Sequence, residues 1–134
     1  MIGCDTNVLI RAVLDDDPNE SKIAQQFLEK TANEKKLFIS SYAILEMVWV
    51  LKVKKRTRAE ISESLMDLLD SPGIVLGQRD AIESALEMYV NGKADFGDYL
   101  ILAEGESHHA QKLASFDKML CKDNIRAQHP KKYI

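Results

Sequence analysis

The sequence predicts a single α/β domain, in which helices cover both faces of a mainly parallel sheet of short strands. Short apolar runs alternate along the chain with longer segments whose apolar residues recur at helical spacing. This alternation is typical of a parallel sheet enclosed by helices. The length of 134 residues suits one domain, and no repeat, linker or low-complexity segment divides it. We therefore expect one domain over residues 1–134.

The expected elements follow in order from the N-terminus. Strands are expected over residues 2–4, 37–39, 74–76 and 112–116, and helices over about 7–14, 20–35, 57–70, 80–90 and 96–107. A further helix is expected from a cap at Ser40 or Ser41 to about Val53. Thr57 with Glu60 three residues later is the signature of a capping box at the start of the fourth helix. A further turn is expected over residues 117–120, and the tail from residue 124 is compatible with an edge strand.

Composition restricts the possible functions. The net charge of −3 argues against nucleic-acid binding by bulk electrostatics, so such a role must depend on local basic patches and bound cations. Cys4 and Cys121 follow no metal-ligand spacing and suit a reducing cytoplasm. The first residues do not resemble a signal peptide, and no apolar run approaches the ~18 residues of a membrane span. A cytoplasmic protein without a membrane segment is the expectation.

Acidic residues stand at or just beyond the carboxyl ends of the expected strands, where ligands bind in open α/β sheets. Asp5 directly follows the first strand, and Asp117 follows the fourth. Glu46 lies about one turn into the helix after the second strand. Asp98 lies at the start of a helix, with Asp95 one turn before it on the same face.

Each acid has an alternative interpretation. Asp5, Asp95 and Asp117 could each be the N-cap of the helix that follows. Glu46 is harder to explain in this way, because it lies in a largely apolar helix where a carboxylate needs a counter-charge. Carboxylates gathered at one sheet edge are the ligands of a hard cation such as Mg²⁺ or Mn²⁺. Zinc is disfavoured, because the three histidines show no ligand spacing.

Four segments resemble those of PIN-domain nucleases, and most closely those of the VapC-type toxins of bacterial toxin–antitoxin pairs. The segments are Asp5-Thr6-Asn7-Val8-Leu9-Ile10-Arg11, the stretch from Ile39-Ser40-Ser41 to Leu45-Glu46-Met47-Val48-Trp49-Val50-Leu51, Ala94-Asp95-Phe96-Gly97-Asp98, and Ser115-Phe116-Asp117. They occur in family order and span nearly the whole chain. The resemblance implies a three-layer α/β/α sandwich with a central, mainly parallel sheet.

The resemblance also implies an activity, which is the metal-dependent hydrolysis of RNA phosphodiester bonds by four acids. These are Asp5, Glu46, Asp98 and Asp117, which would bind Mg²⁺ or Mn²⁺. Asp95 would be an accessory acid, and three other residues would orient carboxylates or waters: Thr6, Asn7 and Ser115. Ser115 stands where family members frequently have threonine, and it keeps the hydroxyl. The family further implies an RNA substrate, a cognate antitoxin protein, a homodimer and the role of toxin in a type II module.

Two further features bear on RNA binding. A basic run follows the helix that carries Glu46 and could contact the RNA backbone: Lys52, Lys54, Lys55, Arg56 and Arg58. An ordinary solvated helix end is the alternative interpretation of this run. Trp49, one turn from Glu46, is expected to pack in the core rather than to stack on a base.

Two other functions remain as alternatives. The first is a non-catalytic RNA- or protein-binding module that keeps the same fold. The complete set of four acids argues against it, because a scaffold has no need to hold uncompensated carboxylates together. The second is a phosphotransfer domain of the receiver or Asp-x-Asp phosphatase type. Asn7 stands where the second acid of the Asp-x-Asp pattern would be, which argues against a phosphatase.

Overall fold

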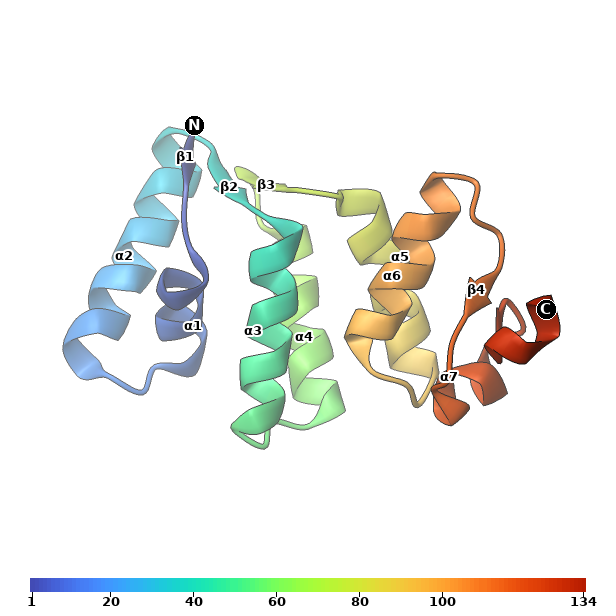
Figure 1. Ribbon diagram of the computed structural model, residues 1–134. Coiled ribbons are helices and arrows are strands. Elements are labelled where there is room, and N and C mark those ends of the chain that lie inside the picture. The colour runs from blue at the N-terminus through green and yellow to red at the C-terminus, as the bar shows by residue number, and fades with distance from the viewer. The chain divides into compact units, whose positions relative to one another are not determined.

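The computed structural model describes residues 1–134 as a mixed α/β protein of seven α-helices and short parallel strands (Figure 1). The expected fold class is thereby confirmed. Residues 1–79 and 80–134 form two compact units. None of the helices combines the length and the apolar character that crossing a membrane requires.

The first unit contains a three-stranded parallel sheet in the order β1-β2-β3. Its strands are β1 (Ile2–Gly3), β2 (Leu37–Ile39) and β3 (Ile74–Leu76). In the central strand, Leu37 pairs with Ile2 on one side and with Ile74 on the other. Parallel neighbours need a crossover connection, and here each crossover is a pair of helices. The pairs are α1 (Thr6–Leu14) with α2 (Pro18–Glu34), and α3 (Ser41–Val53) with α4 (Arg58–Asp70).

The core of the first unit lies between the sheet and these helices. Leu37 and Ile39 of β2 are fully buried, as are Leu9 of α1 and both Ile44 and Met47 of α3. α1 packs against both α2 and α3, and α3 lies beside α4 (Figure 1). Burial of these side chains is the main source of stability, because removal of apolar surface from water drives folding. It also fixes the position of the two segments that follow β1 and β2.

Local signals set the ends of these helices. The side chain at each N-cap accepts a backbone N–H from the first turn; the four caps are Asp5, Asp17, Ser40 and Thr57. The expected capping box of α4 is confirmed, since the Thr57 hydroxyl accepts the Glu60 N–H (3.1 Å) and Glu60 accepts the Thr57 N–H (2.9 Å). After α4 the chain turns at Gly73, whose φ of 82° favours glycine.

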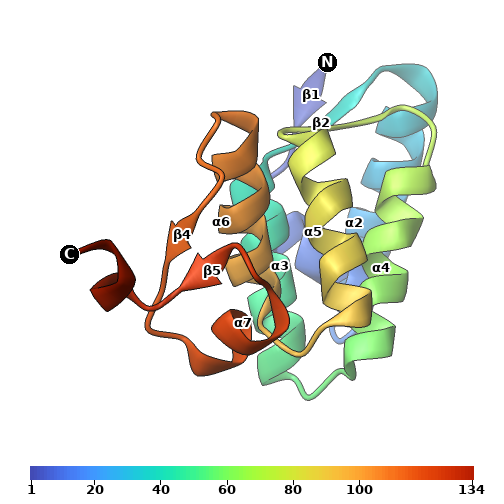
Figure 2. The same cartoon turned by 90° about the vertical axis from the view of Figure 1, so that its right-hand side faces the viewer.

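The second unit contains two long helices and a two-stranded parallel sheet. The helices are α5 (Arg79–Asn91) and α6 (Phe96–Ser107). β4 (Leu113–Ala114) pairs with β5 (Ala127–Gln128), and the short helix α7 (Lys118–Asp123) connects them (Figure 2). A 3₁₀ helix, η1 (Pro130–Tyr133), ends the chain.

The structure differs from the expectations mainly near the C-terminus. The strands lie in two hydrogen-bonded sheets rather than in one. The strand expected over 112–116 is limited to Leu113–Ala114. The Ser115 N–H still donates to the Gln128 carbonyl (2.9 Å), and the Ser115 hydroxyl accepts the backbone N–H of Asp117 (3.0 Å) in the turn that follows. The turn expected over 117–120 extends to Asp123, and the strand in the tail is β5. Most other boundaries differ by one or two residues.

Candidate functional site

Asp5 lies between β1 and α1, and it is the N-cap of that helix. Its backbone is extended, and its Oδ1 accepts the N–H of Val8 (3.2 Å). The N-cap interpretation of Asp5 is therefore correct, but it uses only part of the acceptor capacity of the carboxylate. The residue is exposed. Together with Asn7 it borders a hollow of about 450 Å³ that is lined by residues of α1 and α2.

Glu46 is half-buried on α3 and has a partner on α1. The Thr6 hydroxyl donates a hydrogen bond to its Oε1 (3.1 Å). The Thr6 hydroxyl, a neutral donor, thus offsets part of the free-energy cost of placing the Glu46 carboxylate in a largely apolar helix. Because Thr6 directly follows Asp5, this bond places the Glu46 side chain beside the start of α1.

The other predicted acids lie in the second unit. Asp95 occupies the N-cap position of α6 without a side-chain capping bond, and Asp98 lies in the first turn of that helix. Asp117 is the N-cap of α7, and its Oδ1 accepts the N–H of Leu120 (2.8 Å). Ser115 accepts the backbone N–H of Asp117 through its hydroxyl. Asp117 is therefore held at two atoms, by the amide of Leu120 and by the hydroxyl of Ser115.

The predicted acids are divided between the two units, with Asp5 and Glu46 in the first and Asp98 and Asp117 in the second. Within neither unit do three or more His, Cys, Asp or Glu side chains gather in a group that could hold a metal ion. The donors themselves suit a hard divalent cation, because all of them are oxygens of carboxylates, hydroxyls or an amide. The additional donors are those of Thr6, Asn7 and Ser115.

Cys4 directly precedes Asp5, and the charge of Asp5 affects the pKa of the Cys4 thiol. Burial, and then the negative charge of Asp5, raise the pKa of the Cys4 thiol above its usual value. In the metal-free protein the thiol form of Cys4 is therefore favoured over the thiolate.

The basic run lies at the C-terminal end of α3 and in the turn to α4. Four of its members are exposed and Arg58 is half-buried; the exposed ones are Lys52, Lys54, Lys55 and Arg56. Lys54 is eight residues beyond Glu46, which is about 12 Å along the helix axis. Both interpretations of the run, a solvated helix end and an RNA contact, are compatible with this position.

The expectation that Trp49 packs in the core is wrong, since 67% of its surface is exposed. α3 buries the opposite face, which carries Ile44, Met47 and Leu51. Trp49 shares its exposed face with Tyr42 (69% exposed) and with Val53. The exposure of Trp49 was missed because apolar residues occur on every side of α3, so that helical spacing alone does not mark Trp49 as exposed.

The family model of the PIN domain matches residues 2–123, a range that includes all four motif segments. No curated protein matches the sequence at a significant level. PIN domains are generally nucleases that act on nucleic acids and need divalent metal ions. Because the match extends over most of its length, the chain belongs to the PIN domain family.

Proposed function

We propose that this protein is an endoribonuclease that depends on Mg²⁺ or Mn²⁺ and acts as the toxin of a type II toxin–antitoxin module. The observation that carries the proposal is the hydrogen bond from Thr6 to Glu46, two residues 40 positions apart. It supports a shared role for the Asp5 and Glu46 carboxylates, because a structural helix pairing does not need an acid at that position. The order of the four motifs within a PIN domain supports the same conclusion.

The residues that would hold the cation are the four acids, Asp5, Glu46, Asp98 and Asp117. A bound cation would polarise the phosphate, favour ionisation of a water molecule and stabilise the leaving oxygen. Hydrolysis joins the water oxygen to phosphorus and releases the 3′ oxygen of the RNA.

The contribution of the protein itself is the orientation of its carboxylates. One oxygen of Asp5 is held by the Val8 amide, and one oxygen of Asp117 by the Leu120 amide. The Thr6 hydroxyl holds one oxygen of Glu46 in the same way. In each case the second oxygen can serve as a ligand without a loss of rotational freedom at the moment of binding.

RNA is the proposed substrate, and the basic run would bind its backbone. The exposed side chains of Lys54, Lys55 and Arg56 support this assignment. A chain with a net charge of −3 has little general attraction for polyanions, so local contacts and the cation would supply it.

Two protein partners are proposed. An antitoxin would place an arginine among the acids, since a guanidinium can bridge carboxylates through paired hydrogen bonds. A small neighbouring gene for a DNA-binding protein would support the antitoxin. The exposed apolar face of α3, formed by Tyr42, Trp49 and Val53, supports a homodimer, because monomers rarely leave large apolar patches in water. Light scattering that finds only a monomer at micromolar concentration would contradict the dimer.

The decisive experiment measures RNA cleavage by the full chain with Mg²⁺ or Mn²⁺, using a mixture of tRNA, rRNA and mRNA. We expect Asp98→Asn and Asp5→Asn to lose cleavage by more than about a hundredfold, beyond the usual cost of removing a group that only orients a ligand. EDTA should act in the same direction, and the circular dichroism spectrum should not change.

The matched control is Glu104→Gln, which removes one exposed negative charge from α6, the helix that carries Asp98. This variant should cleave like the wild type. Full activity of Asp98→Asn, or cleavage that persists in EDTA, would refute the proposed function. RNA binding by a wild-type protein that does not cleave would point to the non-catalytic alternative.

A further inference from the structure

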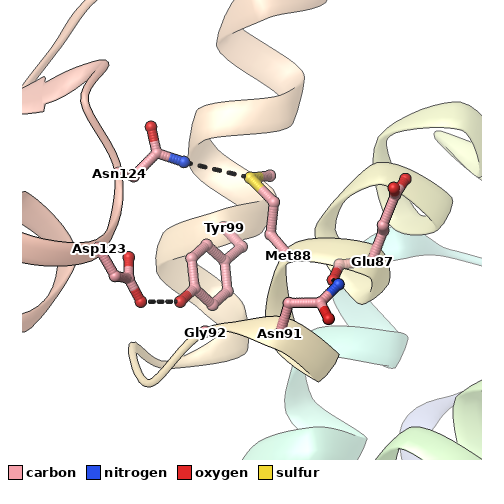
Figure 3. A pocket seen from close by; sticks show the side chains of 7 residues that line it. All are labelled: Glu87, Met88, Asn91, Gly92, Tyr99, Asp123 and Asn124. Atoms are coloured by element: carbon pink, nitrogen blue, oxygen red, sulfur yellow. Dashed lines mark hydrogen bonds between the residues drawn. The ribbon is translucent and has the colours of Figure 1, made fainter.

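The second unit contains a hydrogen-bonded network between the end of α7 and the turn that leads from α5 to α6 (Figure 3). Asp123, the last residue of α7, accepts two hydrogen bonds at Oδ2. One comes from the backbone N–H of Lys93 (2.8 Å) and the other from the Tyr99 hydroxyl (2.5 Å). The Tyr99 hydroxyl in turn accepts the backbone N–H of Ala94 (3.0 Å). Two consecutive amides of the turn are thus held by one carboxylate–phenol pair.

The surroundings make this network rigid. The Tyr99 side chain is almost fully buried, with 1% of its surface exposed. Gly92 lies directly against the pair: a Cβ at this position would overlap the Tyr99 hydroxyl and lie 2.7 Å from Oδ2 of Asp123. Only glycine allows the backbone to approach so closely. Figure 3 shows Gly92 beside the bonded pair. These three residues are among those that line a hollow of about 270 Å³.

The network connects the two segments that carry predicted acids of this unit. The turn leads into α6, where Asp98 directly precedes Tyr99 and lies in the first turn. On the other side, α7 has Asp117 at its N-cap and Asp123 at its end, with the buried Leu120 between them. The hydrogen bond from Tyr99 to Asp123 therefore joins the helix that Asp117 caps to the helix that carries Asp98.

We propose that Asp123 is a positioning residue, which acts through Tyr99 to fix the position of Asp98 relative to Asp117. The inference rests on the proposed function, because that function gives the two acids a common task. The role of Asp123 is one of positioning, because both of its bonds run to groups at the start of α6 or in the turn before it. Groups that orient ligating carboxylates typically change metal affinity by about 10- to 100-fold when they are removed.

The test uses Tyr99→Phe, which keeps the ring and removes only the hydroxyl, and Asp123→Asn, which weakens the acceptor. The readout is the shift of the unfolding temperature of the full chain as Mn²⁺ is added, so that no substrate is needed. We expect the Mn²⁺ concentration at half-maximal shift to rise about 10- to 100-fold in both variants. At saturating Mn²⁺, RNA cleavage should return to nearly the wild-type rate.

The matched control is Glu106→Gln, which breaks an exposed ion pair with Arg126 in the same unit. It should keep the wild-type Mn²⁺ midpoint. If the two test variants also keep that midpoint while Asp98→Asn loses the Mn²⁺ shift, the positioning role is refuted and the proposed function stands. If Asp123→Asn does not fold, Tyr99→Phe decides alone. No Mn²⁺ shift in the wild type would instead refute the proposed function, and this inference with it.

Discussion

At the scale of single residues, two of the four acids have a structural role in addition to the proposed one. Asp5 caps α1 through the Val8 amide, and Asp117 caps α7 through the Leu120 amide. An N-cap needs one carboxylate oxygen, whereas a metal ligand can use the other, so the two roles are compatible. Asparagine caps a helix about as well as aspartate does but carries no charge. Substitutions can therefore separate capping from metal binding.

For Asp5 we expect the Asn and Ala variants to differ in stability but not in activity. Asp5→Ala removes the capping oxygen and should lower the free energy of unfolding by about 0.5–2 kcal/mol, whereas Asp5→Asn should change it little. Both should lose RNA cleavage. Urea unfolding followed by circular dichroism measures the first effect, and the cleavage assay measures the second.

The control pair is Asp17→Asn and Asp17→Ala at the N-cap of α2, which has no proposed role in catalysis. This pair should repeat the stability pattern of Asp5 and keep full activity. An equal loss of stability in Asp5→Asn and Asp5→Ala would show that the capping bond to Val8 contributes nothing.

The acids of the motifs can be identified in the sequence, and their role stays a prediction, whereas the Asp123 network could not be foreseen. The residues of each motif segment lie close together in the sequence, and the type of each residue is itself informative. The partners Asp123 and Lys93 are 30 positions apart. One is an acid at a helix end and the other contributes only its backbone amide, so nothing in their identities signals the bond. For Thr6 the resemblance implied an orienting role, but the identity of its partner Glu46, 40 positions away, depends on the packing of α1 against α3.

Gly92 offers a second prediction at this scale. Gly92→Ala would force a methyl group onto the buried Tyr99 hydroxyl, and overpacking of this kind typically costs about 1–3 kcal/mol. Gly105→Ala is the matched variant, because it makes the same substitution at a position of α6 that has room for a methyl group. Its Cβ would lie 3.5 Å from the Ala110 methyl, which is an ordinary contact. It should stabilise the protein by about 0.5–1 kcal/mol through helix propensity. Thermal unfolding measures the change in stability of each variant. Equal changes for the two substitutions would contradict the close approach at Gly92.

At the scale of elements, the sequence predicts the existence of the helices better than the face that each one buries. A cap at Ser40 or Ser41 and an end near Val53 are expected for α3, which is found over Ser41–Val53 with Ser40 as its N-cap. The exposure of Trp49 was not foreseen, because the apolar residues of α3 do not form a single stripe. Short strands are harder still. β4 and its partner β5 have only two residues each. An alternation of apolar and polar residues over so short a length is too brief to indicate that the two strands pair.

The capping box of α4 leads to a prediction on pH. Hydrogen bonds from Thr57, and the nearby charge of Arg56, lower the pKa of the Glu60 carboxyl from its usual value of 4.5. A carboxyl whose pKa is lower in the folded state stabilises the fold above the unfolded pKa, and this contribution is lost as the pH falls through the folded pKa. The stabilisation by Glu60 is therefore expected to be complete above about pH 4.5 and to be lost as the pH falls from there through the lower pKa of the folded state.

The test compares Glu60→Gln with the wild type by urea unfolding across the acidic range. Glutamine also suits a capping box but does not titrate. The stability deficit of Glu60→Gln should be present near neutral pH and should shrink as the pH falls. Glu63→Gln, an exposed substitution on the same helix outside the capping box, is the control. Its difference in stability from the wild type should depend less on pH than that of Glu60→Gln. A deficit of Glu60→Gln that is independent of pH would contradict the electrostatic explanation.

At the scale of the whole molecule, the fold class and the family could be predicted from the sequence because their signals are spread over the chain. The four motif segments reach from Asp5 to Asp117, and the family match covers residues 2–123. The division of the strands into two sheets was not predicted, because strand pairing depends on contacts between distant segments. A single domain over residues 1–134 stays a prediction. So does a common task for Asp5 and Glu46 of one unit with Asp98 and Asp117 of the other.

That common task has a quantitative consequence for double substitutions across the two units. If Asp5 and Asp98 serve one reaction, loss of either already removes most of the catalysis, so the double variant should be little worse than each single one. If they serve separate sites, the losses in rate should multiply instead. RNA cleavage by Asp5→Asn, Asp98→Asn and the double variant distinguishes these cases. The corresponding cycle with Glu104→Gln in place of Asp98→Asn is the control, and there the effects should be independent.

The Mn²⁺-dependent unfolding temperature supplies a second readout of the same cycle, which does not depend on cleavage. A ligand that binds only the folded state raises the unfolding temperature, and the effect grows with its concentration. In the wild type we therefore expect a shift that increases over the millimolar range of Mn²⁺. Either single substitution should remove most of this shift, and the double variant should lose no more. If Asp98→Asn abolished the shift and Asp5→Asn left it intact, the second unit would bind the cation without Asp5, and the proposal of one shared task would be refuted.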